Sequence, residues 1–121
     1  MATKKQHTDF NRSVSKYLES IGAETKGKSS FNGEWILKTV AGDLNICVRE
    51  PERSEVFSLF CQFQDVEKAK QFIPTHAQRL YKNNTMNGYS GKWNFHAYDA
   101  NELLQEFKTE LSSLLPVIQP V

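Results

Sequence analysis

Residues 87–98 read Asn-Gly-Tyr-Ser-Gly-Lys-Trp-Asn-Phe-His-Ala-Tyr, so a glycine-rich turn leads directly into a segment of alternating apolar and polar side chains. Alternation with a period of two is the pattern of a half-buried strand. The apolar side consists of Trp93, Phe95 and Ala97, and the polar side of Lys92, Asn94, His96 and Tyr98. We therefore predict a strand over residues 91–98. Its apolar side anchors a core, and its polar side either binds a partner or meets water.

Three further strand-like runs precede this segment, over residues 34–40, 44–49 and 56–63. A tight Ala-Gly-Asp turn at residues 41–43 joins the first two, and the polar residues 50–54 lead to the third. Short connections between such runs favour an antiparallel meander. Residues 24–26 are either a loop or a short edge strand, and residues 75–81 either extend a helix or form an edge strand.

Helical periodicity predicts a first helix over residues 9–21. Thr8 or Asp9 can cap its start, because a short side-chain oxygen accepts a hydrogen bond from a free backbone N–H. Gly22 is suited to end it in a left-handed conformation.

Two more helices are expected further along the chain. Asp65 is predicted to cap a short helix that Pro74 ends. Asp99 or Asn101 is predicted to cap a last helix with a strong apolar stripe, which Pro116 ends.

The predicted order of elements is α-β-β-β-α-β-α. It forms a single α+β domain over residues 9–116, between a flexible tail of residues 1–8 and a short tail of residues 117–121. A four-stranded, mainly antiparallel sheet packed against the N- and C-terminal helices would bury the apolar stripes of both.

The composition is that of an ordinary folded domain. The chain has 121 residues, of which 39% are hydrophobic and 24% charged, and its net charge of +1 argues against a strongly electrostatic nucleic-acid binder. Residues 1–9 contain no apolar segment and no stretch approaches the length of a membrane span, so we expect a cytoplasmic protein. Cys47 and Cys61 are expected to be buried free thiols, although a bridge between their strands stays open.

A second candidate surface combines basic and aromatic residues around the opening turn. Arg79, Lys82, Tyr89 and Lys92 could contact phosphates and stack on bases. An ordinary solvated surface is favoured over nucleic-acid binding for these residues, because Glu50, Glu52, Asp65 and Glu67 are expected close by and the total charge is near zero.

Catalysis has little support in the sequence. The three histidines, His7, His76 and His96, are widely separated, and no spacing typical of a metal site occurs. A nucleophilic pair would need Cys47 or Cys61 beside His96 or His76 in space, which the sequence does not decide. We name no catalytic residue, no metal ligand and no cofactor.

Residues 89–96, Tyr-Ser-Gly-Lys-Trp-Asn-Phe-His, resemble a Y-S-G-K-W-N-x-H strand motif of small, largely uncharacterised proteins encoded by bacteriophages and prophages. In the order of elements, the resemblance covers roughly residues 33–112. It implies a viral or mobile-element origin, hence the host cytoplasm, and no established activity. Where such proteins often read Asn-Pro before the Tyr-Ser pair, this chain has Asn-Gly, which implies a looser turn.

Three functions follow from these patterns. The first is a non-enzymatic phage-type accessory protein that contacts a host or phage macromolecule, foremost a protein, through the polar side of strand 91–98 and the loop 83–91. The second is a nucleic-acid-binding module that uses Arg79, Lys82, Tyr89 and Lys92. The third is a small hydrolase or nucleotide-binding enzyme that uses His96. A homodimer is a further expectation if the second sheet face gathers an apolar patch of Ile36, Val56 and Phe60.

Overall fold

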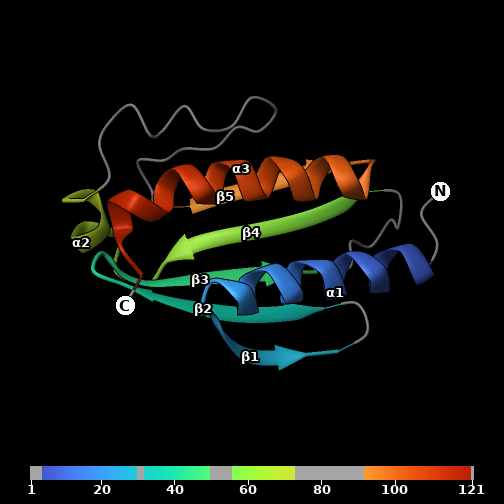
Figure 1. Cartoon of the computed structure of the whole chain (residues 1–121), viewed down its shortest axis with the longest axis horizontal. Helices are drawn as coiled ribbons and strands as arrows, with labels where there is room; N and C mark the ends of the chain where they lie inside the picture. The colour runs from blue at the N-terminus through green and yellow to red at the C-terminus, as the bar shows by residue number, and fades with distance from the viewer. Residues whose placement is uncertain (1–3, 30–31, 50–55, 73–91, 121) are drawn as a thin grey trace.

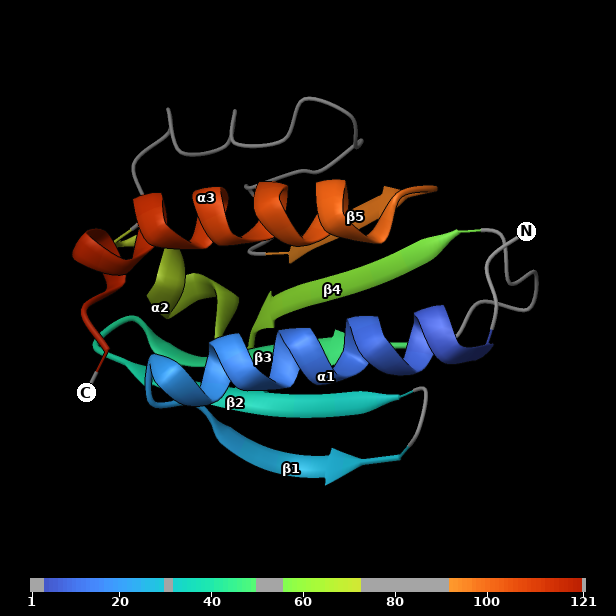
Figure 2. The ribbon, with the colours of Figure 1, turned by 45° about the vertical axis from the view of Figure 1, so that its right-hand side comes forward.

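Five antiparallel strands form one sheet, and the two long helices lie across the same face of it (Figures 1 and 2). The computed structural model describes residues 4–29, 32–49, 56–72 and 92–120. The strands follow one another in the sheet in chain order: β1 (Glu24–Lys28), β2 (Gly33–Thr39), β3 (Gly42–Val48), β4 (Phe57–Phe63) and β5 (Lys92–Ala97). The helices are α1 (Lys4–Ser20), α2 (Val66–Lys70) and α3 (Ala100–Ile118).

The predicted α+β class and the order of elements are confirmed, with one addition. The sheet has five strands rather than four, because residues 24–28 form the edge strand β1 that the sequence left open. Every neighbouring pair is antiparallel. The alternative for residues 75–81 lies outside the described residues.

The core lies between the helices and the sheet because each central strand buries alternate residues. Trp35, Ile46, Leu59 and Phe63 are almost completely buried on this face. From the helices, the same core cluster includes Phe10, Val14, Leu18, Ala69, Leu103, Phe107 and Leu111. The predicted apolar stripes therefore face the sheet, as the helical spacing indicated.

Helix α1 begins at Lys4, so the predicted start at residue 9 and the predicted flexible tail over residues 1–8 are wrong for residues 4–8. Thr8 does not cap the helix, since its Oγ1 donates to the carbonyl of Lys4 within it. His7 is buried, and its ring lies 4.6 Å from that of Phe57. The helix is longer than predicted because β4 supplies an aromatic ring that buries this polar-looking position.

Gly22 ends α1 as predicted, with a positive φ of 93°. The N–H of Ala23 donates to the carbonyl of Leu18 at 3.0 Å, and that of Gly22 donates to the carbonyl of Glu19 at 3.1 Å. This pair of bonds is the Schellman arrangement, which satisfies the last carbonyls of a helix.

The two other helix starts are also confirmed. Asp65 accepts from the N–H of Lys68 at 3.1 Å, and Asp99 accepts from the N–H of Glu102 at 2.9 Å. Of the alternatives for the last helix, Asp99 is therefore the cap. The predicted stop at Pro74 lies outside the described ranges.

The end of α3 was predicted wrongly. The helix passes Pro116 and continues to Ile118, whose side chain is fully buried. The N–H of Val40 contacts the carbonyl oxygens of Ile118 at 3.0 Å and Gln119 at 3.2 Å, and Pro120 forms a bridge with Thr39. Packing against the β2–β3 turn thus outweighs the cost of a proline near the helix end. Within the described ranges, no helix combines the length and apolar character needed to cross a bilayer.

Candidate binding face

The side of the sheet opposite the helices is the first candidate site, and we call it the open face. In the described part of the chain, no helix lies on this side (Figures 1 and 2). Its side chains come from the positions that alternate with the core residues of β2, β3 and β4. They are Glu34, Ile36, Lys38, Asn45, Cys47, Arg49, Ser58, Phe60 and Gln62. Most of them are half-buried or exposed; Ser58 is buried.

The strand register brings the predicted residues of β5 into rows with this face. Lys92 pairs with Gln62, Asn94 with Phe60, and His96 with Ser58. The remaining pairings complete two rows that cross the sheet: Glu24–Ile36–Asn45–Gln62–Lys92 and Glu34–Cys47–Phe60–Asn94. The backbone positions 92, 94 and 96 of β5 are therefore in register with open-face positions of β4, which the sequence alone did not reveal.

The other predicted site residues fall into two groups. Tyr98 follows β5 and is 78% exposed, the highest value among the exposed large hydrophobic residues of the described part. Arg79, Lys82 and Tyr89 lie outside the described residues. The structure therefore bears on the strand-based surface and leaves the basic and aromatic one as a prediction.

Apolar side chains on the open face are interspersed with polar ones. Ile36 pairs with Asn45, and Phe60 pairs with Cys47, so Asn45 and Cys47 of β3 lie between the strands that carry the two large apolar residues. Val56 is half-buried just before β4. The homodimer was expected if these three residues formed one continuous apolar patch, and the polar positions between them interrupt such a patch. The dimer stays a prediction.

Charges on the open face are balanced. The Lys38 ammonium lies 3.8 Å from a Glu24 carboxylate oxygen. Burial first and the Glu34 carboxylate second raise the pKa of the Cys47 thiol, whereas the positive charge of Arg49 opposes the rise. Cations and carboxylates of the described face thus occur in neighbouring positions.

Both cysteines are free thiols, as expected, but only Cys61 is buried. Cys61 faces the core, and burial raises its pKa far above the ordinary thiol value. A raised pKa keeps a thiol protonated at neutral pH, which makes it a poor nucleophile. In the register, Cys61 pairs with Trp93 rather than with His96. Among the described residues, no group of three His, Cys, Asp or Glu side chains could hold a metal ion.

Two hollows in the surface meet at Cys47. One, of about 450 Å³, is lined by residues of β2, β3 and β4 that include Asn45, Phe60 and Gln62. The other, of about 500 Å³, lies toward the β1–β2 hairpin and is lined by residues that include Lys28 and Asn32. Glu34, Cys47 and Arg49 line both hollows. The alternation of residues 44–49 predicted which side chains share a face, but not that they border a hollow.

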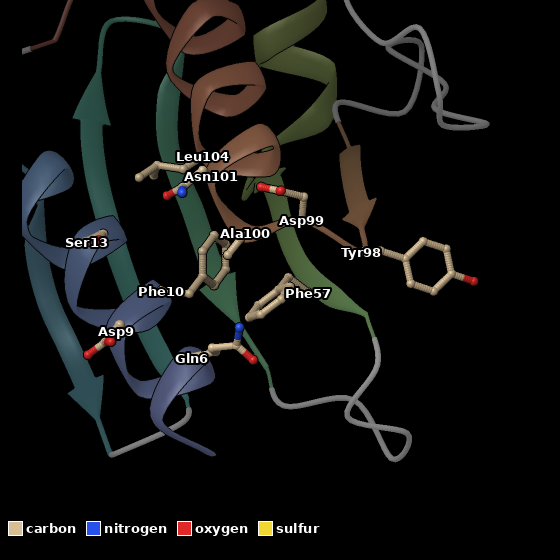
Figure 3. A pocket seen from close by; sticks show the side chains of 10 residues that line it. All are labelled: Gln6, Asp9, Phe10, Ser13, Phe57, Tyr98, Asp99, Ala100, Asn101 and Leu104. Carbon is tan, nitrogen blue, oxygen red and sulfur yellow. The ribbon is translucent and has the colours of Figure 1, made fainter. Parts of the chain in front are cut away.

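A third hollow, of about 570 Å³, lies between the N-terminal halves of the long helices (Figure 3). Further along, these helices touch through Tyr17 and Phe107, whose ring centroids are 5.9 Å apart. The rings of Phe10 and Phe57 border the hollow, whereas Tyr98 points away from it (Figure 3).

The carboxylates of this third hollow already have partners within the chain. Asp9 pairs with Lys5 at 3.1 Å and with Arg12 at 3.9 Å. Asp99 caps α3 through the N–H of Glu102. Tyr98 is among the residues that line this hollow, although its exposed ring points outward from it (Figure 3).

Comparison with protein-family models, with curated proteins and with solved structures finds no match.

Proposed function

We propose that the chain is a non-enzymatic accessory protein of bacteriophage type, which acts by binding a protein of the host or of the phage. The observation that carries the proposal is Tyr98, an aromatic side chain 78% exposed at the end of the strand that bears Lys92, Asn94 and His96. Tyrosine is among the residues that contribute most binding energy in protein interfaces. The viral assignment rests on the resemblance of residues 89–96.

The charges of the open face favour a protein over a nucleic acid as the partner. A nucleic-acid surface gathers cations without nearby carboxylates, because each phosphate contact needs an unneutralised positive charge. Here Lys38 lies beside Glu24, and Arg49 acts on the same thiol as Glu34. Amides, an aromatic ring and balanced charges are instead typical of a protein interface.

The test is comparative capture from a bacterial lysate on the immobilised chain. Four proteins are compared: the wild type, Tyr98→Ala, the double variant Lys92→Ala/His96→Ala, and Phe72→Ala as the matched control. Phe72 is also an exposed aromatic residue, 39% exposed, but it follows α2, which comes after the opposite end of β4 from the end that pairs beside Tyr98. We expect a protein that the wild type and the control retain and the other two variants lose.

The retained protein is then purified and its Kd measured by calorimetry. Tyr98→Ala should raise the Kd at least tenfold, which corresponds to about 1.4 kcal/mol. Circular dichroism of each variant checks that it is folded. Equal retention by all four proteins would contradict the proposal. So would a retained nucleic acid, bound with a steep dependence on salt, in place of a protein.

A further inference from the structure

The two hollows that meet at Cys47 form a trough on the open face, and their lining suggests what the trough holds. The half toward the β1–β2 hairpin has two exposed cations, Lys28 and Arg49, and one carboxylate, Glu34. Two positive charges and one negative charge leave this half with a net charge of +1. The half over β4 shares Glu34 and Arg49 with the first half and adds the Phe60 ring and the amides of Asn45 and Gln62.

With Lys28 at one end, Phe60 at the other and Arg49 in the wall common to both hollows, this lining indicates an amphipathic occupant. A guanidinium group binds a carboxylate with a fork of two N–H donors, so Arg49 is suited to an acidic side chain. The half-buried Phe60 ring is suited to an apolar one. Side-chain amides both donate and accept hydrogen bonds, as a peptide backbone does. Asn45 and Gln62 can therefore hydrogen-bond to the occupant's backbone between its acidic and its apolar side chain.

The strand register sets the spacing of the two side chains. Cys47 pairs directly with Phe60, and Arg49 follows two residues after Cys47, just past the end of β3 at Val48. Phe60 and Arg49 line the same hollow, and diagonal neighbours on paired strands stand about 7–8 Å apart at their backbones. Two residues of an extended peptide span about 6.6 Å.

We propose that the trough binds an extended peptide segment of the partner protein, in which an acidic residue and an apolar residue stand two positions apart. The acidic side chain lies on Arg49 and Lys28, and the apolar side chain lies on Phe60. This inference rests on the proposed function, because it names the part of a protein partner that the open face recognises.

Selection from a random peptide library displayed on phage, with the intact chain as bait, tests the inference. Three baits are compared: the wild type, Arg49→Glu, and Lys16→Glu as the control with the same change of charge. Lys16 is an exposed residue of α1, the helix that lies on the opposite face of the sheet (Figure 1). We expect the wild type and the control to enrich peptides with Asp or Glu two positions from an apolar residue. A synthetic peptide of this kind should bind Arg49→Glu at least tenfold more weakly than the control.

Cys47 supplies an independent readout, since it is the half-buried thiol in the common wall while Cys61 is buried in the core. Saturating peptide should slow alkylation of Cys47 by N-ethylmaleimide at least fivefold, as followed by mass spectrometry. Failure to enrich any peptide would overturn the inference, as would enrichment without acidic residues or an unchanged alkylation rate. These outcomes are separate from those of the lysate experiment: a partner lost by Tyr98→Ala upholds the proposed function even if the trough binds no peptide.

Discussion

Replacing Gly33 with alanine tests how closely α1 is seated on the sheet. Gly33 is the buried first residue of β2. An added Cβ would lie 2.7 Å from Trp35 Cζ2 and 2.8 Å from Asn11 Oδ1, and it would also clash with Trp35 Cη2. These separations are below van der Waals contact, so the indole ring or the Asn11 side chain must move.

Neither neighbour can move without cost. Trp35 is fully buried in the core. The Asn11 amide donates to the carbonyl oxygens of Ser29 at 2.9 Å and Asn32 at 3.2 Å, which joins α1 to the β1–β2 hairpin. Overpacking a core costs about 1–3 kcal/mol, and each weakened hydrogen bond adds about 1 kcal/mol. Alanine also restricts the unfolded chain more than glycine does, which offsets about 0.4–1 kcal/mol of this loss of stability. We therefore expect Gly33→Ala to lower the free energy of unfolding by about 2 kcal/mol.

Urea unfolding of a small set of variants measures this cost. Gly27→Ala is the matched control, because no atom lies within 4 Å of its added Cβ. It should be neutral or stabilise by up to about 1 kcal/mol. In a Trp35→Phe background, the cost of Gly33→Ala should fall by about 1 kcal/mol, because the outer indole ring is gone. If Gly33→Ala is as mild as Gly27→Ala, or its cost is unchanged in that background, the steric reasoning is refuted.

Three further predictions concern helix ends and buried thiols. Asp99→Ala should lower the free energy of unfolding by about 1 kcal/mol in urea, while Asp99→Asn should retain most of the cap. Pro116→Ala should raise the midpoint of thermal unfolding, with a gain of about 1 kcal/mol, because it restores a backbone N–H inside α3; a lower midpoint would show that the proline is favourable there. The pKa of Cys61 is raised above its ordinary value of 9.0 in the folded chain only, so stability should fall as the pH rises above 9, and Cys61→Val should remove most of that slope.

The parts of the fold that the sequence predicted depend on local chemistry. Gly22, Asp65 and Asp99 end or begin helices through bonds to residues within five positions of themselves, so their roles are visible in a short stretch. The alternation along β2, β3 and β4 likewise identifies the face of each side chain.

The parts that the sequence did not predict depend on distant contacts. His7 is buried because it meets Phe57, fifty positions later, and α3 continues past Pro116 because its end packs against Val40. The trough depends on the register that sets Cys47 beside both Glu34 and Phe60. Alternation predicts a face but not which residues of neighbouring strands stand together on it, so the sequence did not predict the trough, and the polar side of β5 stays a prediction.

The open face and the β1 edge of the sheet differ in a way that favours the open face as a binding surface. At the edge, all five residues of β1 are exposed, two of them are Lys26 and Lys28, and the pairing with β2 is irregular between Thr25 and Gly27. Lysines and bulges on an edge strand oppose the addition of a further strand. The pairings of β2, β3 and β4 behind the open face are regular, and regular pairing holds neighbouring side chains at fixed spacings. A partner that approaches along β1 would have to displace charges and straighten a strand, whereas a peptide in the trough requires neither. For that reason we propose the open face, rather than the β1 edge, as the surface that binds a partner.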